Sequence, residues 1–236
     1  MPVDFFLSGA KRAVTVDLYR RLDYNIMENG LFYLAKNRNL IESLYSNKTN
    51  SIILNESLNL LSKYWFTPRQ FIKMANIQYL AQADAANTNL LNDSIDYHIS
   101  TNTLEHIPYE VIRNIFFKAK RILKDSVIAI HFIDMSDHFQ HQDNSICRIN
   151  FLRFSDNDWS KIAGNQFAFC NRLRVNDYLN LFNELKFNIV HIEKIIDENS
   201  MNKIQDGFKI NKKFNSYNIE DICTTSLKVM LRKKDN

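Results

Sequence analysis

An alternation of strand-like and helix-like segments between residues 95 and 132 is the feature that most constrains the fold. Residues 95–99 alternate apolar and polar side chains, residues 126–132 are mostly apolar, and residues 109–123 between them carry a continuous apolar stripe at helical spacing. A strand, a helix and a strand in this order form a right-handed crossover between parallel strands. The chain is therefore predicted to build an α/β fold with a mostly parallel sheet.

Further strands and helices are expected on either side of this unit. The predicted helices cover residues 3–7, closed by Gly9, residues 25–45 with an interruption at Gly30, residues 56–64, a segment after Thr67, a turn near Trp159, and residues 176–185. The earlier predicted strands cover residues 13–17 and 77–81. Two late β-rich segments, residues 187–196 and 225–231, are separated by a polar stretch without a convincing helix, which predicts an antiparallel pair at a sheet edge.

The length and composition are those of one globular protein. At 236 residues, of which 45% are hydrophobic and 24% charged, the chain is predicted to form a single domain over residues 1–236, with residues 134–174 as a loop-rich insertion. The formal charge of +4 is scattered and forms no basic stripe. No nucleic-acid partner is therefore expected.

The cysteines and the first residues bear on the compartment. Cys147, Cys170 and Cys223 are far apart and odd in number, which argues for a reducing environment and against a disulfide framework. The N-terminus lacks the basic and long apolar regions of a secretion signal, and no apolar run is long enough to cross a bilayer. We therefore expect a cytoplasmic protein without membrane insertion, and the sequence leaves its oligomeric state open.

Polar residues follow two of the predicted strands. Asp17 ends the strand at residues 13–17, and Ser100, Thr101 and Asn102 follow the strand at residues 95–99. In open α/β sheets ligands bind outside the carboxyl ends of the strands, where an acidic residue commonly accepts hydrogen bonds from ribose hydroxyls. The same residue types also serve as turn residues and helix N-caps. Both interpretations stay open at this point.

Several short segments, in order along the chain, resemble one family. They are SGAKRAVTVD at residues 8–17, ADA at 83–85, SIDY at 94–97, LEHIP at 104–108 and AKRIL at 119–123, while residues 150–155 and 171–174 resemble a subgroup. Together they resemble class I S-adenosylmethionine-dependent methyltransferases of the group called methyltransferase type 11. The resemblance spans nearly the whole chain. It implies a Rossmann-like fold, S-adenosylmethionine as cofactor, and methyl transfer to a small-molecule, sugar or lipid acceptor.

The resemblance also implies roles for individual residues. Asp17 would accept hydrogen bonds from the ribose hydroxyls of the cofactor, and Asp84 with Ala85 would line the adenine pocket. Residues 100–102 would approach the methionine end. The acceptor pocket would be built chiefly from the variable segments at residues 31–73 and 134–174.

One part of the family pattern has no counterpart, namely its first strand and the glycine-rich loop that follows it. Only 16 residues precede Asp17, and Gly9, the single glycine among them, is expected to close a helix. In the family the first strand lies between those placed here at residues 13–16 and 95–99. We therefore expect a chain truncated at its N-terminus, with Met1 as an internal or misassigned start or the stub of a broken gene. Weaker cofactor binding and two exposed strand edges would follow.

Candidates for acceptor contact follow the two central strands. Glu105 and His106 come after the strand at residues 95–99. The candidates at or after the end of the next strand are His131, Asp134, Asp137 and His138. His106 or His138 is expected to be the general base, because an unperturbed histidine titrates near neutral pH. Glu105 and His106 are equally suited to opening a helix, since acids are preferred in a first turn.

No metal site is predicted. The segment after the strand at residues 126–132 has metal-ligand residue types, but their spacing fits no well-defined site. These residues are His131, Asp134, Asp137, His138, His141 and Asp143. Arg172 and Arg174, with Asn171, would either bind an anionic acceptor through the arginine fork or pair with acids on the surface.

Two other classes of function compete with the enzyme. A non-catalytic methyltransferase-like binding module, or an inactive gene fragment, is favoured by the missing glycine loop and opposed by the retained Asp17, Asp84 and LEHIP segment. A dinucleotide oxidoreductase has little support, because G-x-G-x-x-G does not occur in the sequence.

Overall fold

The computed structural model describes residues 2–63, 66–165 and 168–234. Met1 and Tyr64, which the sequence analysis named, lie outside the described residues. The described chain divides into two compact units, Met1–Thr88 and Asn89–Asn236, and each is described by itself. The expectation of a single domain over residues 1–236 stays a prediction.

Unit 1 combines a two-stranded sheet with five α-helices among its described residues. Its elements are α1 (Pro2–Leu7), β1 (Ala13–Asp17), α2 (Tyr24–Lys36), α3 (Arg38–Tyr45), α4 (Ser51–Lys63), α5 (Pro68–Met74), β2 (Ile77–Ala81) and the 3-10 turn η1 (Ala85–Asn87). β1 and β2 pair in parallel, with Ala13 opposite Ile77 and Asp17 opposite Ala81. The carboxyl ends of both strands therefore lie at the same edge of this sheet.

Local signals explain several boundaries in unit 1. α1 ends at Leu7, and the φ of +84° at Gly9, two residues later, confirms the expected glycine closure. α5 begins after Thr67, whose hydroxyl accepts from the Gln70 amide while the Gln70 side chain accepts from the Thr67 amide. Apolar faces of the helices then pack around the buried side chains of Leu58 and Phe71. The expected capped and proline-led start of α5 is thus confirmed.

Unit 2 holds the larger sheet. Its strands and α-helices are β3 (Ile95–Thr101), α6 (Tyr109–Ile122), β4 (Leu123–Asp134), α7 (Asp156–Ala163), α8 (Val175–Glu184), β5 (Phe187–Ile196), α9 (Glu198–Gln205), α10 (Ile219–Cys223) and β6 (Thr224–Lys233). Its 3-10 turns are η2 (Leu104–His106), η3 (His138–His141), η4 (Asn150–Arg153) and η5 (Lys212–Phe214). The strand order is β3-β4-β6-β5.

The strand directions in unit 2 confirm the predicted sheet. β3 and β4 are parallel and joined through α6, as the strand–helix–strand pattern predicted. β6 runs antiparallel to both β4 and β5, and β5 forms the sheet edge. The chain therefore has the Rossmann-like α/β character expected of it, with parallel pairs and an antiparallel C-terminal pair.

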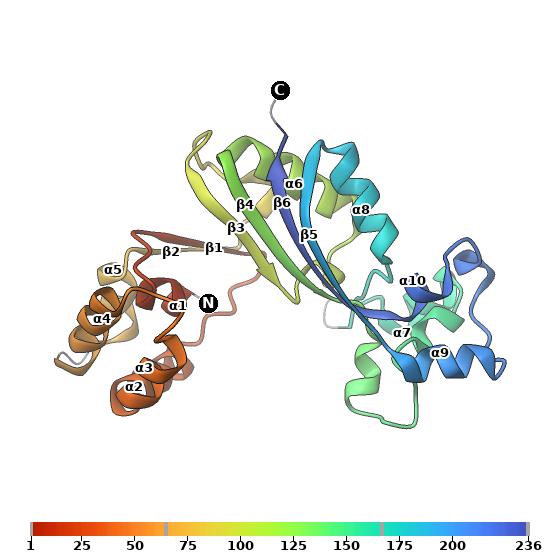
Figure 1. Cartoon of the computed structure of the whole chain (residues 1–236), viewed down its shortest axis with the longest axis horizontal. Coiled ribbons are helices and arrows are strands. Elements are labelled where there is room, and N and C mark those ends of the chain that lie inside the picture. Colours follow the sequence, from red (N-terminus) through yellow and green to blue (C-terminus); the bar gives the residue numbers. More distant parts are fainter. Residues whose placement is uncertain (1, 64–65, 166–167, 235–236) are drawn as a thin grey trace. The chain divides into compact units, whose positions relative to one another are not determined.

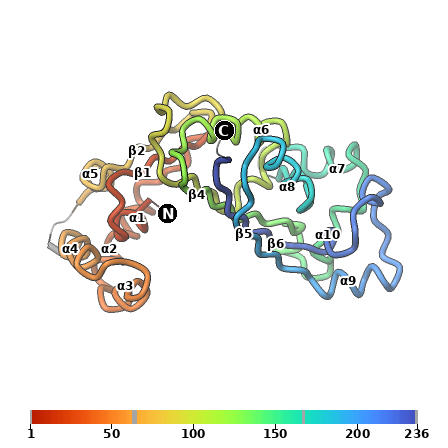
Figure 2. Tube along the Cα trace, turned by 45° about the horizontal axis from the view of Figure 1, so that its top comes forward, coloured from red at the N-terminus to blue at the C-terminus, as the bar shows by residue number. Residues whose placement is uncertain are grey.

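One face of this sheet is covered by α6 and α8 (Figures 1 and 2). Phe116 of α6 and Phe182 of α8 are fully buried, with ring centroids 4.8 Å apart, and both belong to the main core together with Val229 of β6. Burial of each such apolar side chain contributes roughly 1.5–3 kcal/mol. A second apolar cluster, around Trp159 and Phe214, forms the core beneath α7, α9 and α10.

Two helix boundaries differ from expectation. α2 continues through Gly30 and ends at Lys36, with Asn37 as its C-cap. A single glycine inside a helix costs only about 1 kcal/mol relative to alanine, which does not suffice to end this helix. α9 and α10 occupy the region expected to lack a helix. Both are short, and the side chains of Asp197 and Asn218 cap their N-termini. Apolar side chains of both helices, among them Ile222, also pack in the core around Phe214.

Four strands of the described chain are paired on one side only, namely β1, β2, β3 and β5. In the described part of the chain β1 pairs with β2 alone, and β3 pairs with β4 alone. No described helix is long and apolar enough to cross a membrane.

Candidate functional site

Glu105 is the buried centre of the candidate site in unit 2. It lies in η2, directly after β3, and only 2% of its surface is exposed. The turn is held by Asn171, whose side-chain amide donates to the carbonyls of Leu104 and Ile107 at 2.8 Å, and whose backbone amide donates to the Glu105 carbonyl at 2.8 Å. Neither carboxylate oxygen of Glu105 has a hydrogen-bond partner among the described residues.

Burial changes the acid–base behaviour of Glu105. Loss of solvation disfavours the charged form, and the nearby Asp134 carboxylate repels it, so the pKa of Glu105 rises to about 7. The carboxyl group is therefore near half-protonation at neutral pH. Its surroundings include the side chains of Asp134, Cys170, Asn171 and Tyr178.

His106 is exposed, and its ring orientation is fixed by one hydrogen bond. Its Nδ1 lies 2.8 Å from the Phe169 carbonyl oxygen. A carbonyl oxygen only accepts, so Nδ1 carries the proton and Nε2 holds the lone pair. The Nε2 atom is thus available as a base or a ligand atom.

His138 approaches from the segment after β4. It is the first residue of η3, a turn capped by Asp137, whose Oδ1 accepts from the Phe139 amide at 3.0 Å. The ring centroid of His138 lies 4.9 Å from that of His106. Its buried Nε2 makes no hydrogen bond among the described residues, and the nearest carboxylate oxygen, Oδ2 of Asp134, is 3.6 Å away. Burial lowers the pKa of His138, so the ring is neutral at pH 7.

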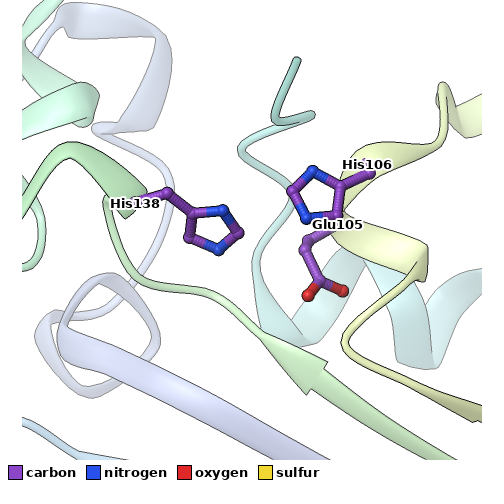
Figure 3. A group of neighbouring side chains, drawn as sticks. All are labelled: Glu105, His106 and His138. Atoms are coloured by element: carbon purple, nitrogen blue, oxygen red, sulfur yellow. The ribbon is translucent and has the colours of Figure 1, made fainter. Parts of the chain in front are cut away.

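Figure 3 shows the three side chains together, with the rings of His106 and His138 turned toward one another and the Glu105 carboxylate beside them. One donor atom from each of the three residues lies within 4.8 Å of the other two. Because β3 and β4 are parallel neighbours, their carboxyl ends bring the two segments to one edge of the sheet. The structure thus brings together the three residues that the sequence analysis named as catalytic candidates.

The residues expected to bind the ribose and adenine lie in unit 1. Asp17 ends β1, is half-buried, and makes no side-chain hydrogen bond or ion pair among the described residues. Its carbonyl accepts from the Ala83 amide at 3.1 Å, which holds the segment after β2 beside the end of β1. Asp84 caps η1, because its Oδ1 accepts from the Ala86 amide at 2.8 Å, and Ala85 is the first residue of that turn. The cap interpretation of Asp84 is therefore observed, and adenine contact stays a prediction.

The residues expected near the methionine end lie in unit 2. β3 extends through Thr101, so Ser100 and Thr101 are part of the strand rather than of the turn. The Ser100 hydroxyl lies 2.7 Å from Nδ1 of the fully buried His131. Asn102 has a φ of +48° and its amide donates to the Phe132 carbonyl at 2.9 Å, which makes it the turn residue after β3. A cofactor role for these residues stays a prediction.

The acidic and histidine-rich segment at residues 131–143, which includes the end of β4, does not gather as one group. His131 faces the core, Asp137 caps η3, and Asp143 accepts from the Ser145 amide at 2.9 Å. Asp134 lies between His138 and His141, with Oδ2 3.6 Å and 3.7 Å from their Nε2 atoms. Only His138 of this segment joins the group with Glu105 and His106.

The two arginines after residue 170 have structural roles. Arg174 is fully buried, and its guanidinium donates to the carbonyls of Met135, Asp221 and Ile222 at 3.0–3.1 Å and also to that of Thr224. Arg172 donates to the Phe154 carbonyl at 2.7 Å and pairs with Asp156 at 2.5 Å. These bonds occupy the guanidinium groups of both arginines. The alternative that the arginines bind an anionic acceptor therefore has no support here. Asn171 holds the Glu105 turn through hydrogen bonds to residues more than 60 positions earlier in the sequence. No local sequence pattern predicts such a contact.

Several solved structures are similar to this chain, all at low identity. A SAM-dependent methyltransferase from Methanosarcina mazei is 11% identical, with 68% of each chain covered and a TM-score of 0.41. A geranyl diphosphate methyltransferase bound to GPP and sinefungin is 10% identical, with 98% of this chain and 77% of that chain covered and a TM-score of 0.45.

A geranyl diphosphate C-methyltransferase from Streptomyces coelicolor is 8% identical, with a TM-score of 0.42. The match covers 75% of this chain and 60% of that chain, so it spans less than two thirds of that protein. No protein-family model and no curated protein matches this chain. These likenesses are too distant to identify an activity.

Proposed function

We propose that the chain is an S-adenosylmethionine-dependent methyltransferase acting on a small-molecule, sugar or lipid acceptor. The observation that carries the proposal is the meeting of Glu105, His106 and His138 at the carboxyl ends of β3 and β4. This is the edge at which open α/β sheets bind ligands. The resemblance in the sequence assigns the same two strand ends to the acceptor side.

The cofactor residues are proposed from the strand ends of both units. In unit 1 the unpartnered Asp17 carboxylate would accept hydrogen bonds from the ribose hydroxyls, and Asp84 with Ala85 would lie beside it at the adenine. In unit 2 Ser100 and Thr101, at the end of β3, and Asn102, directly after it, would face the methionine part.

The proposed reaction is an in-line displacement at the methyl carbon. The acceptor atom forms a bond to the methyl group while the sulfur–methyl bond breaks, and sulfur takes the electron pair as the sulfonium becomes a neutral thioether. Positioning supplies much of the rate in such a reaction. Where the acceptor must lose a proton, Nε2 of His106 or of the neutral His138 would take it.

Calorimetric titration with S-adenosylhomocysteine tests the proposal. We expect micromolar binding to the full chain, and we expect Asp17→Ala to weaken it by about tenfold or more, since a hydrogen bond to a charged group contributes roughly 1.5–3 kcal/mol. Asp206→Ala is the matched control, because Asp206 is exposed and lies at the end of α9. No binding at millimolar ligand would contradict the proposal and favour a non-catalytic binding module.

A further inference from the structure

The group formed by Glu105, His106 and His138 has the donor set of a metal site. It offers two imidazole nitrogens and one carboxylate, and one donor atom of each residue lies within 4.8 Å of the others. Two histidines with one carboxylate are a recurrent ligand set for zinc and other first-row divalent ions. Two chain segments contribute, one after β3 and one after β4 (Figure 3).

The Glu105 carboxylate is the second, independent observation. The side chain is 2% exposed, and both of its oxygens lack a hydrogen-bond partner among the described residues. A buried carboxylate is costly unless it is paired, protonated or bound to a metal. Asp134 lies close enough to repel Glu105, so the two carboxylates together favour a cation at this point.

Each of the two histidines offers one ring nitrogen to the group. The His106 Nδ1–H donates to the Phe169 carbonyl, which leaves Nε2 for an ion. A backbone carbonyl on the far ring nitrogen is the usual way in which proteins orient a metal-ligating histidine. His138 Nε2 is buried without a hydrogen bond, and Asp134 Oδ2 lies 3.6 Å from it as a possible fourth donor.

We propose that Glu105, His106 and His138 bind a divalent first-row transition-metal ion of the zinc class. Ligand bonds of about 2.0–2.2 Å in a tetrahedral site place donor atoms roughly 3.3 Å apart. The three donors lie within 4.8 Å of one another, and binding an ion would draw them closer together. The fourth position falls to Asp134 or to a water molecule.

The proposal goes beyond methyl transfer and does not depend on it. A metal ion and a proton compete for the same nitrogen lone pairs, so in a metal-loaded chain the two histidines are ligands and not bases. Metal binding is measured without S-adenosylmethionine, so its failure and the failure of the proposed function are separate results.

Titration of the chelator-treated full chain with Zn²⁺ alone, followed by calorimetry, tests the site. We expect one ion per chain. We expect Glu105→Gln, His106→Gln and His138→Gln each to weaken binding by at least about tenfold, since even outer-shell changes cost 10–100-fold. His191→Gln is the matched control, because His191 is an exposed histidine of β5 in the same unit. Its affinity for Zn²⁺ is expected to equal that of the unmodified chain.

Absence of saturable Zn²⁺ binding, or equal affinity in all four variants, would overturn the proposal. A measurement on the unmodified chain covers the case of a variant that does not fold. Paramagnetic Co²⁺ in place of Zn²⁺ is expected to shift the imidazole NMR signals of His106 and His138 and to leave those of His191 in place. Shifts confined to other histidines would contradict the site.

Discussion

Glu105 stabilises the fold most when it is protonated. Its pKa rises from 4.5 to about 7 on folding, chiefly because of burial and then because of Asp134. Between these two pH values the folded chain binds more protons than the unfolded chain. The contribution of Glu105 to stability is therefore fully present below pH 4.5 and is lost as the pH rises through 7.

Glu105→Gln removes this titration and keeps the shape of the side chain. We expect the free energy of unfolding of the unmodified chain to fall relative to that of the variant by about 3 kcal/mol between pH 4 and pH 8. Urea unfolding at a series of pH values, with chelator present, measures the difference. Glu56→Gln, at an exposed position of α4, is the control and should show no such divergence. If the free energy of unfolding depended on pH in the same way for Glu105→Gln and for the unmodified chain, the expectation would be refuted.

Arg174 holds together the segments around β6 and the end of β4. Its guanidinium donates to carbonyls of Met135, Asp221, Ile222 and Thr224, and a lysine ammonium cannot reproduce that planar set of bonds. We expect Arg174→Lys to lower the free energy of unfolding by about 3 kcal/mol or more. Chemical denaturation measures the loss. Arg232→Lys is the control, because Arg232 is exposed. Its free energy of unfolding is expected to change by less than about 0.5 kcal/mol. Equal losses of stability in the two variants would contradict the structural role of Arg174.

The sequence named the three site residues but could not show that they meet. Glu105, His106 and His138 were identified because they follow two strands predicted to be neighbours, and that neighbourhood is confirmed. Their approach depends on the Asn171 side chain, which closes the Glu105 turn from a distant segment. Such a contact leaves no local pattern in the sequence, and neither does the burial that raises the pKa of Glu105.

At the scale of single elements, α5 shows a helix start set by its cap. The Thr67 hydroxyl and the Gln70 side chain satisfy each other's backbone amides at the first turn. We expect Thr67→Ala to cost about 1 kcal/mol of stability in unit 1, measured by chemical denaturation. Thr67→Ser keeps the hydroxyl and is expected to lose only a fraction of that amount. A loss as large in the serine variant would show that the cap is not responsible.

The strands and long helices were predictable because their signals are local. Residues 77–81 and 187–196 match β2 and β5 at both ends, and α6 begins at Tyr109 as its apolar stripe indicated. Helices without an apolar stripe were missed. α9 and α10 are held by side-chain caps and by packing around Phe214 and Ile222, which the polar sequence between the last two strands does not reveal.

At the scale of the whole molecule, unit 2 has what a folding unit needs. It contains the four-stranded sheet and two apolar cores of its own, and the core around Phe71 lies entirely in unit 1. We expect a fragment of residues 89–236 to unfold cooperatively on heating, with far-UV circular dichroism typical of an α/β protein. A fragment without a cooperative transition, next to a full chain that has one, would contradict this independence.

Because some strands are paired on one side only, their backbone amides are unevenly protected from hydrogen exchange. β4 and β6 have a partner on both sides, whereas in the described part of the chain β3 is bonded to β4 alone. Alternate amides of β3 therefore point away from the ladder that protects the others. In deuterated water we expect those amides to exchange orders of magnitude faster than the amides of β6 in the same sheet. A ligand or chain segment that forms hydrogen bonds to the outer side of β3 would be detected because it slows the exchange of those amides.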